Sequence, residues 1–210
     1  YKYSYEEVIK HGRSMNPFGL DHVLAERQYI DTVVLDSVTA LTDMALRQAV
    51  DLRLGAGKGF SPTMEHPGMS AYGGRNAITL EVLTGLLRVT AKHGVHLIIT
   101  AHEADPEKDA EGVVQYITIM LGGKLVSNVT WRISEFWYLS DDGRGRQLAI
   151  RPTRKHRPMK SRMFVGVGEP EFVLEYDATK SDKGQMTIAS FYEQWVQSGK
   201  KLPIPVSYTH

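Results

Sequence analysis

Two short runs rich in apolar and β-branched residues mark the first half of the chain. Residues 30–35 read Ile-Asp-Thr-Val-Val-Leu, and residues 95–100 read Val-His-Leu-Ile-Ile-Thr. Runs of this length that end in polar residues are typical of strands buried in a parallel sheet. We therefore predict two parallel strands, each of which opens into a polar loop.

Helical periodicity occupies much of the sequence between these strands. Apolar residues at 41, 44, 45, 49 and 52 predict a helix over 41–54, and a second apolar face predicts a helix over 75–93, which Gly94 ends. Between them, residues 55–74 contain six Gly and two Pro with almost no periodicity, which predicts one long mobile loop. The order strand, helix, loop, helix, strand indicates an α/β unit with right-handed crossovers.

The flanking segments follow other patterns. A short helix is predicted over residues 5–11, and the segment 103–111 is an acidic loop. Residues 133–139 and 147–151 flank Asp-Asp-Gly-Arg-Gly, which predicts a β-hairpin, and a last helix is predicted near 188–197. The chain therefore divides into an N-terminal segment 1–28, a core 29–165 and a C-terminal extension 166–210.

Composition excludes several classes of protein. The 210 residues carry 25 Lys and Arg against 24 Asp and Glu, so bulk charge gives no argument for or against nucleic acid. No apolar run approaches the ~20 residues of a membrane helix, so we expect a soluble protein. The absence of cysteine excludes a disulfide scaffold, a thiolate metal site and a cysteine nucleophile. The first residue is Tyr1 and no export signal is visible, so we expect a piece of a longer protein.

Both predicted strands end in polar residues that suit a ligand. The first continues into Asp36-Ser37 and the second into Ala101-His102-Glu103. Open α/β sheets bind ligands outside the carboxyl ends of their strands. A carboxylate there suits Mg²⁺, which keeps several waters and takes few protein oxygens, and an imidazole suits a terminal phosphate or its attacking water. The alternatives are that Asp36 or Ser37 caps the next helix and that His102 is structural.

Other kinds of site find less support. His66, His93 and His96 form no ligand set with zinc spacing, and no G-x-S-x-G elbow is present. Aromatic residues 131, 136, 137 and 138 are typical of a core or an interface.

Residues 33–41, Val-Val-Leu-Asp-Ser-Val-Thr-Ala-Leu, resemble the Walker B strand and exit of RecA-like ATPases, in which serine follows the aspartate. Residues 97–103, the glycine-rich excursion, Gly122-Gly123-Lys124-Leu125, Phe136-Trp137-Tyr138 and the basic hairpin are similar to phage-encoded RecA-like nucleotide-binding proteins associated with recombination. The resemblance covers about residues 29–165. It implies an α/β fold, a RecA-like P-loop NTPase core with a mainly parallel sheet flanked by helices, plus a C-terminal β-hairpin extension.

The resemblance also implies a reaction and its participants. ATP and Mg²⁺ would bind between subunits of a homo-oligomer, a ring or a filament, and hydrolysis would be coupled to single-stranded DNA in the host cytoplasm. Asp36 would be the magnesium-associated carboxylate and Ser37 its hydrogen-bonding neighbour. Thr39 and Glu103 would lie beside the nucleotide, and His102 would occupy the sensor position.

A basic segment supplies a second part of the implied site. Residues 143–168 contain eight Arg or Lys and no acid. Lys160-Ser161-Arg162 resembles the Lys-x-Arg pair that some RecA-like hexamers insert into the neighbouring nucleotide site, where cations offset the charge of the transferred phosphoryl group. The alternative for Lys160 and Arg162 is a solvated basic face or a DNA contact.

The P-loop is the main departure from the family. The pattern G-x-x-x-x-G-K-[ST] between a strand and a helix does not occur. Gly55-Ala56-Gly57-Lys58-Gly59 is not a match, because Gly59 follows the lysine and the segment follows a predicted helix. Relatives carry the P-loop upstream, so the chain is either a truncated ATPase or a degenerate, non-hydrolysing member. In both cases we expect these residues alone to bind ATP poorly.

DNA contacts are predicted in the glycine-rich segment 55–76. Lys58, Phe60, Tyr72 and Arg75 combine cations that bind phosphates with rings that stack on bases. The alternative is a disordered surface loop. Two further hypotheses remain: a non-catalytic module that binds DNA or a partner on a degenerate RecA-like scaffold, and a phage DNA-packaging motor, against which Ser37 counts because such motors usually have glutamate there.

Overall fold

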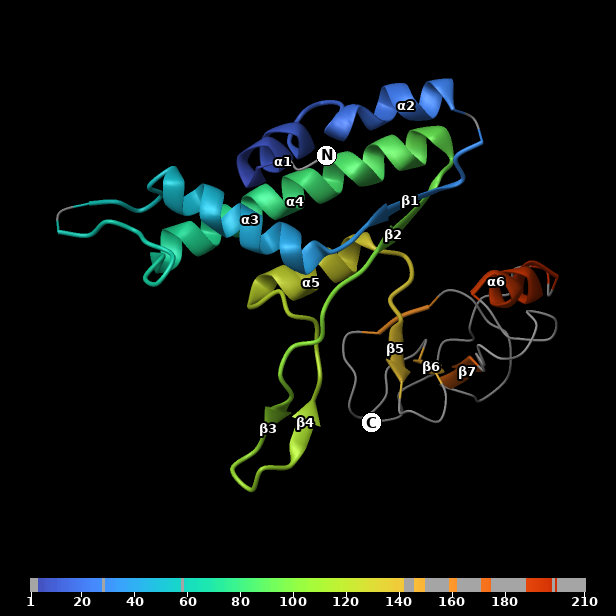
Figure 1. Ribbon diagram of the computed structural model, residues 1–210. Coiled ribbons are helices and arrows are strands. Elements are labelled where there is room, and N and C mark those ends of the chain that lie inside the picture. Colours follow the sequence, from blue (N-terminus) through green and yellow to red (C-terminus); the bar gives the residue numbers. More distant parts are fainter. Residues whose placement is uncertain are drawn as a thin grey trace. The chain divides into compact units, whose positions relative to one another are not determined.

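The computed structural model describes residues 4–27, 29–57, 59–141, 146–149, 159–161, 171–174, 188–197 and 199 (Figure 1). The chain divides into two compact units. Unit 1 comprises residues 1–103 and 119–126, and unit 2 comprises residues 104–118 and 127–210. The boundaries that we predict for the core, at residues 28 and 165, remain predictions. Among the described residues, no helix is both long enough and apolar enough to cross a bilayer.

A pair of parallel strands in unit 1 confirms the first expectation. β1 (Thr32–Leu35) pairs with β2 (His96–Ile99), and Val33 lies opposite Leu97. The pairing extends past both ends of the strands, because His96 donates from N–H to the Asp31 carbonyl at 2.9 Å and Thr100 donates to the Leu35 carbonyl at 3.0 Å. The residues that follow β1 and β2 therefore lie at one edge of the pair.

The two faces of this pair differ in exposure. The expectation that both strands are buried is wrong, because exposed residues alternate with partly buried ones along each strand, and α4 packs against β2. Val34 and Ile98, on the other face, are 58% and 47% exposed. Within the described ranges the remaining sheets are antiparallel, so the mainly parallel RecA-like sheet stays a prediction.

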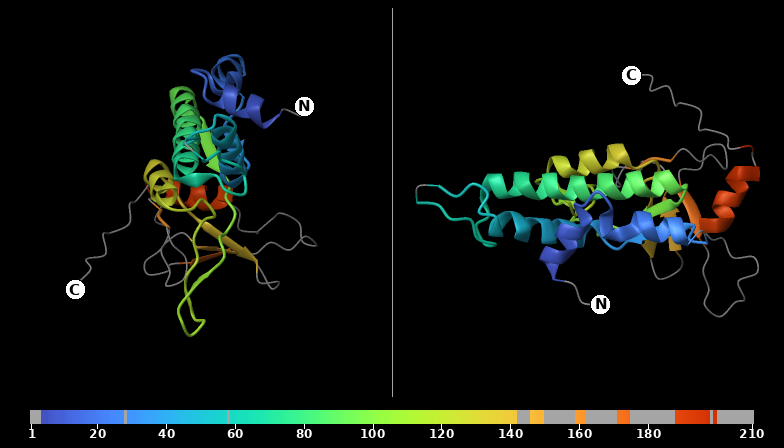
Figure 2. Two further views of the ribbon diagram at one scale, coloured as in Figure 1. Left: turned by 90° about the vertical axis from the view of Figure 1, so that its left-hand side faces the viewer. Right: turned by 90° about the horizontal axis from the view of Figure 1, so that it is seen from above.

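Two long helices form the centre of unit 1. α3 (Val38–Asp51) begins three residues before the predicted helix and runs beside α4 (Gly68–His93), as Figure 2 shows. Gly94 ends α4 in the left-handed conformation at φ 67°. Small and branched residues of the two helices are fully buried, among them Ala45, Ala49, Ala71, Ile78, Val82, Leu83 and Leu86.

The prediction that residues 55–74 form one loop is wrong at its C-terminal end, because α4 begins at Gly68. A methyl group on Gly74 would lie 2.3 Å from Leu54 Cδ1 and 3.1 Å from Ala49 Cβ. Gly74 therefore permits close packing of α4 against α3, and the glycine cluster reflects helix contact there. The preceding segment has its own hydrogen bonds, with Gly57 and Phe60 joined in both directions at 3.1 Å.

The N-terminal segment packs on these helices as α1 (Tyr5–Gly12), a 3₁₀ turn η1 (Pro17–Gly19) and α2 (Leu20–Glu26). The helix predicted over 5–11 is confirmed, whereas α2 was not predicted. A methyl group on Gly85 would lie 2.7 Å from Pro17, so the absence of a side chain at Gly85 lets Pro17 pack against α4. Ion pairs surround the contact, including Arg13 with Glu81 at 2.6 Å.

Unit 2 contains short antiparallel elements. β3 (Glu107–Lys108) and β4 (Val114–Tyr116) form a hairpin, so the acidic segment predicted as a loop is partly strand. β5 (Tyr138–Asp141) pairs with β6 (Arg146–Ala149), which confirms the predicted hairpin, and β6 pairs with β7 (Glu171–Leu174). α6 (Ile188–Gln197) confirms the last predicted helix. α5 (Lys124–Arg132), whose first three residues belong to unit 1 and the rest to unit 2, was not predicted.

Candidate functional site

The carboxyl edge of the β1–β2 pair holds an exposed carboxylate. Asp36 directly follows β1, and its Oδ1 accepts a hydrogen bond of 2.5 Å from the Thr100 hydroxyl, which follows β2. Strand alternation places Asp36 on the same face as Val34. Within the described part of the chain Oδ2 has no hydrogen-bond partner. One carboxylate oxygen is thus held by the neighbouring strand, and the other is open to a ligand.

Ser37 performs the structural role that was the alternative for this position. It is the N-cap of α3, where its Oγ accepts a hydrogen bond of 3.1 Å from the Ala40 N–H. The residue is only 6% exposed, and Val38 N–H donates to the Thr100 carbonyl at 2.9 Å. Ser37 therefore fixes the turn that follows Asp36, and its role beside a nucleotide stays a prediction.

His102 lies at the same edge, on a main chain that is held from two sides. Its N–H donates to Thr39 Oγ1 at 3.0 Å, and its carbonyl accepts from the Met120 N–H at 2.9 Å. The imidazole is exposed, and no side-chain partner is found among the described residues. Glu103 follows with an exposed side chain and a backbone bridge to Ile119.

Thr39 lies buried in the first turn of α3. The residue is 6% exposed, and its hydroxyl accepts the His102 N–H. It joins the first turn of α3 to the residue after β2, so it positions His102. Contact between Thr39 and a nucleotide stays a prediction.

The carboxyl edge of the β1–β2 pair suits a magnesium ion only if the ion takes most of its ligands from other molecules. In the described ranges, no group of three or more His, Asp or Glu side chains comes together as metal ligands. A single open carboxylate oxygen on Asp36 fits an ion that takes its other ligands from water and nucleotide phosphates, which is the usual preference of Mg²⁺. The residues present therefore fit a magnesium–nucleotide complex in which the protein contributes one carboxylate through water.

A second group of predicted residues forms a row along the start of α4. The Phe60 ring lies over Gly68, where an added methyl group would come within 2.9 Å of the ring. The Arg75 guanidinium lies 5.1 Å from the centroid of the Tyr72 ring. Because Gly68, Tyr72 and Arg75 are spaced four and three residues apart on a helix, they share one face. Tyr72 and Arg75 both belong to α4, which confirms the helix predicted from Arg75 onward and corrects the loop predicted for Tyr72.

Arg75 has no carboxylate in hydrogen-bond contact within the described residues. Its Nε and Nη2 donate to Asn76 Oδ1 at 3.1 and 2.9 Å, and a methyl group on Gly122 would lie 3.6 Å from Nη2. Burial lowers the pKa of the Arg75 guanidinium, which Tyr72 and Asp43 partly oppose. An arginine keeps its charge despite such a shift. The arrangement leaves a partly buried cation beside an aromatic ring, which suits a phosphate or a base.

Sequence reasoning missed Asn76 and Gly122 in this row. The spacing of Gly68, Tyr72, Arg75 and Asn76 on one helical face was visible in the sequence, but the glycines concealed the helix. Nothing in the sequence alone placed Gly122 beside Arg75. Lys58 and Arg162 lie outside the described residues.

Lys160 lies in unit 2, where its backbone pairs with that of Phe136. The Phe136 N–H donates to the Lys160 carbonyl at 2.7 Å, and the Lys160 N–H donates back at 3.1 Å. The Lys160 residue is partly buried. Its insertion into a neighbouring nucleotide site remains a prediction.

Comparison of the chain with protein-family models, with curated proteins and with solved structures finds no match.

Proposed function

We propose that the chain is the RecA-like core of a phage recombination or replication protein that binds Mg²⁺ and ATP and acts on single-stranded DNA. The observation that carries the proposal is the polar edge of a parallel strand pair, where Asp36 has one open oxygen and lies beside Thr100. The ends of parallel strands are where α/β proteins bind phosphorylated ligands.

The roles proposed for the chain's residues follow from their contacts. Asp36 orients water around the magnesium ion, whose chemistry is to neutralise the phosphate charge. Thr100 holds the Asp36 carboxylate in one orientation. Thr39 fixes the main chain of His102, so the exposed imidazole is available to hydrogen-bond a terminal phosphate.

The test of the nucleotide site compares the two carboxylates that flank β1. Asp31 and Asp36 are both exposed, but Asp31 precedes β1 and Asp36 follows it. Magnesium-dependent ATP hydrolysis is measured on the complete natural protein and on its Asp36→Asn and Asp31→Asn variants. We expect Asp36→Asn to abolish turnover and Asp31→Asn to retain it. Equal turnover in the two variants would exclude the role of Asp36.

A second candidate function is a module that binds DNA without hydrolysing ATP. The row of Phe60, Tyr72 and Arg75 favours it, because these contacts involve no residue of the Asp36 edge. Aromatic rings beside a cation suit single strands, in which bases are free to stack.

DNA binding is tested on the 210-residue chain, without nucleotide, by fluorescence anisotropy of a labelled oligothymidylate. Loss of one stacked base weakens binding by about 1–3 kcal/mol, so Tyr72→Ala is expected to raise Kd by roughly tenfold. Arg75→Ala is expected to weaken binding and reduce its salt dependence. Arg47→Ala, which removes an exposed arginine of α3, is the matched control and is expected to bind like the parent chain. Unchanged binding in Tyr72→Ala and Arg75→Ala would exclude this surface.

A further inference from the structure

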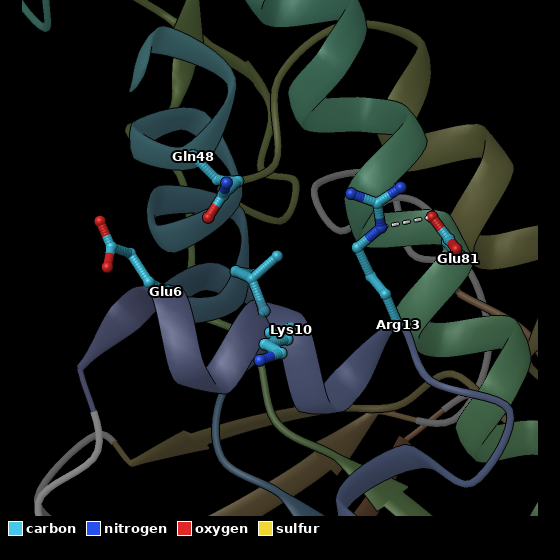
Figure 3. A pocket seen from close by; sticks show the side chains of 6 residues that line it. Glu6, Lys10, Arg13, Gln48 and Glu81 are labelled. Carbon is cyan, nitrogen blue, oxygen red and sulfur yellow. Dashed lines mark hydrogen bonds and ion pairs between the residues drawn. The ribbon is translucent and has the colours of Figure 1, made fainter. Parts of the chain in front are cut away.

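A pocket of about 520 Å³ opens where α1 meets α3 and α4, in unit 1. The lining residues are Glu6, Ile9 and Lys10 from α1, Arg13 directly after α1, Gln48 from α3 and Glu81 from α4 (Figure 3). The pocket is an open depression on the surface of unit 1, lined largely by exposed side chains. No residue of the Asp36 edge or of the Phe60–Tyr72–Arg75 row lines it.

The pocket lining carries charges of both signs. Ile9 lies at the base of the pocket but is only 1% exposed, so the accessible lining is formed mainly by the long polar side chains around it. Lys10 and Arg13 supply two positive charges, and Glu6 and Glu81 supply two negative charges, so the lining is neutral overall. Arg13 and Glu81 pair with each other at 2.6 Å, whereas Glu6 and Lys10 form no ion pair among the described residues, so a ligand that carries both signs suits them better than an anion or a cation alone.

The donors at one end of the pocket have unused capacity. Arg13 uses Nε to pair with Glu81 at 2.6 Å, which leaves its two terminal nitrogens without a partner in the described part of the chain. The Lys10 ammonium also has none there. These groups suit a carboxylate, which accepts such charge-assisted hydrogen bonds well.

The opposite end of the pocket suits a cation. The Glu6 carboxylate accepts only a long hydrogen bond of 3.4 Å from the Tyr5 hydroxyl. The Gln48 amide has no hydrogen-bond partner among the described residues and offers both a donor and an acceptor. An ammonium group would satisfy Glu6, and the Gln48 amide matches a peptide group.

The spacing along α1 sets the length of the ligand. A helix rises about 1.5 Å per residue, so Glu6 stands about 6 Å from Lys10 and about 10 Å from Arg13 along the axis. An extended peptide covers at most about 3.3–3.6 Å per residue. A free di- or tripeptide therefore spans the distance from the carboxylate of Glu6 to the cations of Lys10 and Arg13.

We propose that the α1–α3–α4 pocket binds a short zwitterionic peptide, with the peptide's ammonium at Glu6 and its carboxylate at Lys10 and Arg13. The proposal does not depend on the proposed nucleotide or DNA function, because it uses none of those residues.

The test uses triglycine as the probe and amide NMR shifts of the chain as the readout. We expect saturable shift changes on the facing parts of α1, α3 and α4. N-acetyltriglycine lacks the ammonium and triglycinamide lacks the carboxylate, and each is expected to bind at least about tenfold more weakly, since charge-assisted hydrogen bonds contribute about that much. Absence of saturable changes, or equal binding of the blocked peptides, would overturn the proposal.

Variants separate this pocket from other charged surfaces. Lys10→Met and Glu6→Gln each remove one charge from an exposed side chain, and both are expected to weaken triglycine binding by about tenfold or more. Arg47→Met removes an exposed cation of α3 outside the pocket and is expected to bind like the parent. Thermal unfolding followed by circular dichroism checks that each variant is folded. Parent-like binding by the folded Lys10→Met and Glu6→Gln variants would exclude the site.

Discussion

Two adjacent glycines of α4 provide a direct test of how closely α3 and α4 pack. A methyl group on Gly73 meets nothing within 4 Å, whereas one on Gly74 would lie 3.1 Å from Ala49 Cβ and 2.3 Å from Leu54 Cδ1. Both positions are helical, so replacement by alanine brings the same gain in helix propensity, about 0.5–1 kcal/mol. Any difference between the two variants therefore reports packing.

The expected magnitude follows from these contacts. Leu54 is partly buried and its terminal methyl can rotate away, but the Cβ of the fully buried Ala49 cannot. Overpacking of a core costs about 1–3 kcal/mol. Gly74→Ala should thus be destabilised by about 0–2 kcal/mol after the gain in propensity, while Gly73→Ala should be stabilised by about 0.5–1 kcal/mol.

Urea unfolding followed by circular dichroism at 222 nm measures the difference. With an m-value of about 2 kcal/mol per molar, a gap of about 2 kcal/mol separates the two midpoints by about 1 M. Equal midpoints for Gly73→Ala and Gly74→Ala would refute the close helix contact at Gly74.

Three further predictions concern single hydrogen-bonding groups. Hydrogen bonds from Lys92 and then His93 lower the pKa of Asp21 below its usual 3.8. The ionised carboxylate therefore stabilises the fold above pH 3.8, and this contribution disappears as the pH falls through the lowered pKa. The difference in melting temperature between the parent and Asp21→Asn should narrow below about pH 4, and a difference that stays constant with pH would contradict the prediction. Ser37→Ala removes the α3 N-cap and should cost about 1 kcal/mol in urea unfolding, whereas no loss would show that the cap contributes nothing. Thr39→Val leaves the His102 N–H without its acceptor, so it should cost about 1–3 kcal/mol and speed amide exchange at His102, and unchanged exchange would argue against this hydrogen bond.

Local pattern was sufficient for elements whose own residues determine them. The β-branched runs predicted β1 and β2 within two residues, and the turn residues between 139 and 147 predicted the β5–β6 hairpin. These patterns are set by the order of residues within each element, and they do not depend on contacts with distant parts of the chain.

The start of α4 could not be predicted in this way. Glycines at 68, 73 and 74 read as loop residues because glycine weakens an isolated helix. In the structure, contacts from distant residues explain two of them, since Phe60 covers Gly68 and Leu54 approaches Gly74. Such contacts outweigh propensity, and they join residues whose separation along the chain gives no periodic pattern.

The candidate site was predicted in part. The order of the strands placed Asp36 and His102 at one edge, as the sequence indicated. The cap formed by Ser37 was one of the alternatives that the sequence left open, whereas the role of Thr39, which accepts the His102 N–H, was not predicted. The sequence does not reveal whether a hydroxyl near a predicted binding residue already accepts a hydrogen bond within the protein.

On the exposed face of the β1–β2 pair, covering the apolar side chains would also affect the hydration of the Asp36 carboxylate. Val34 and Ile98 favour cover by another apolar surface, yet the Asp36 carboxylate lies on that same side. Whatever shields these two aliphatic groups also strips hydration from the neighbouring anion, and an uncompensated anion in a dry environment is costly. A molecule that binds to this face must therefore carry a positively charged group beside its apolar surface.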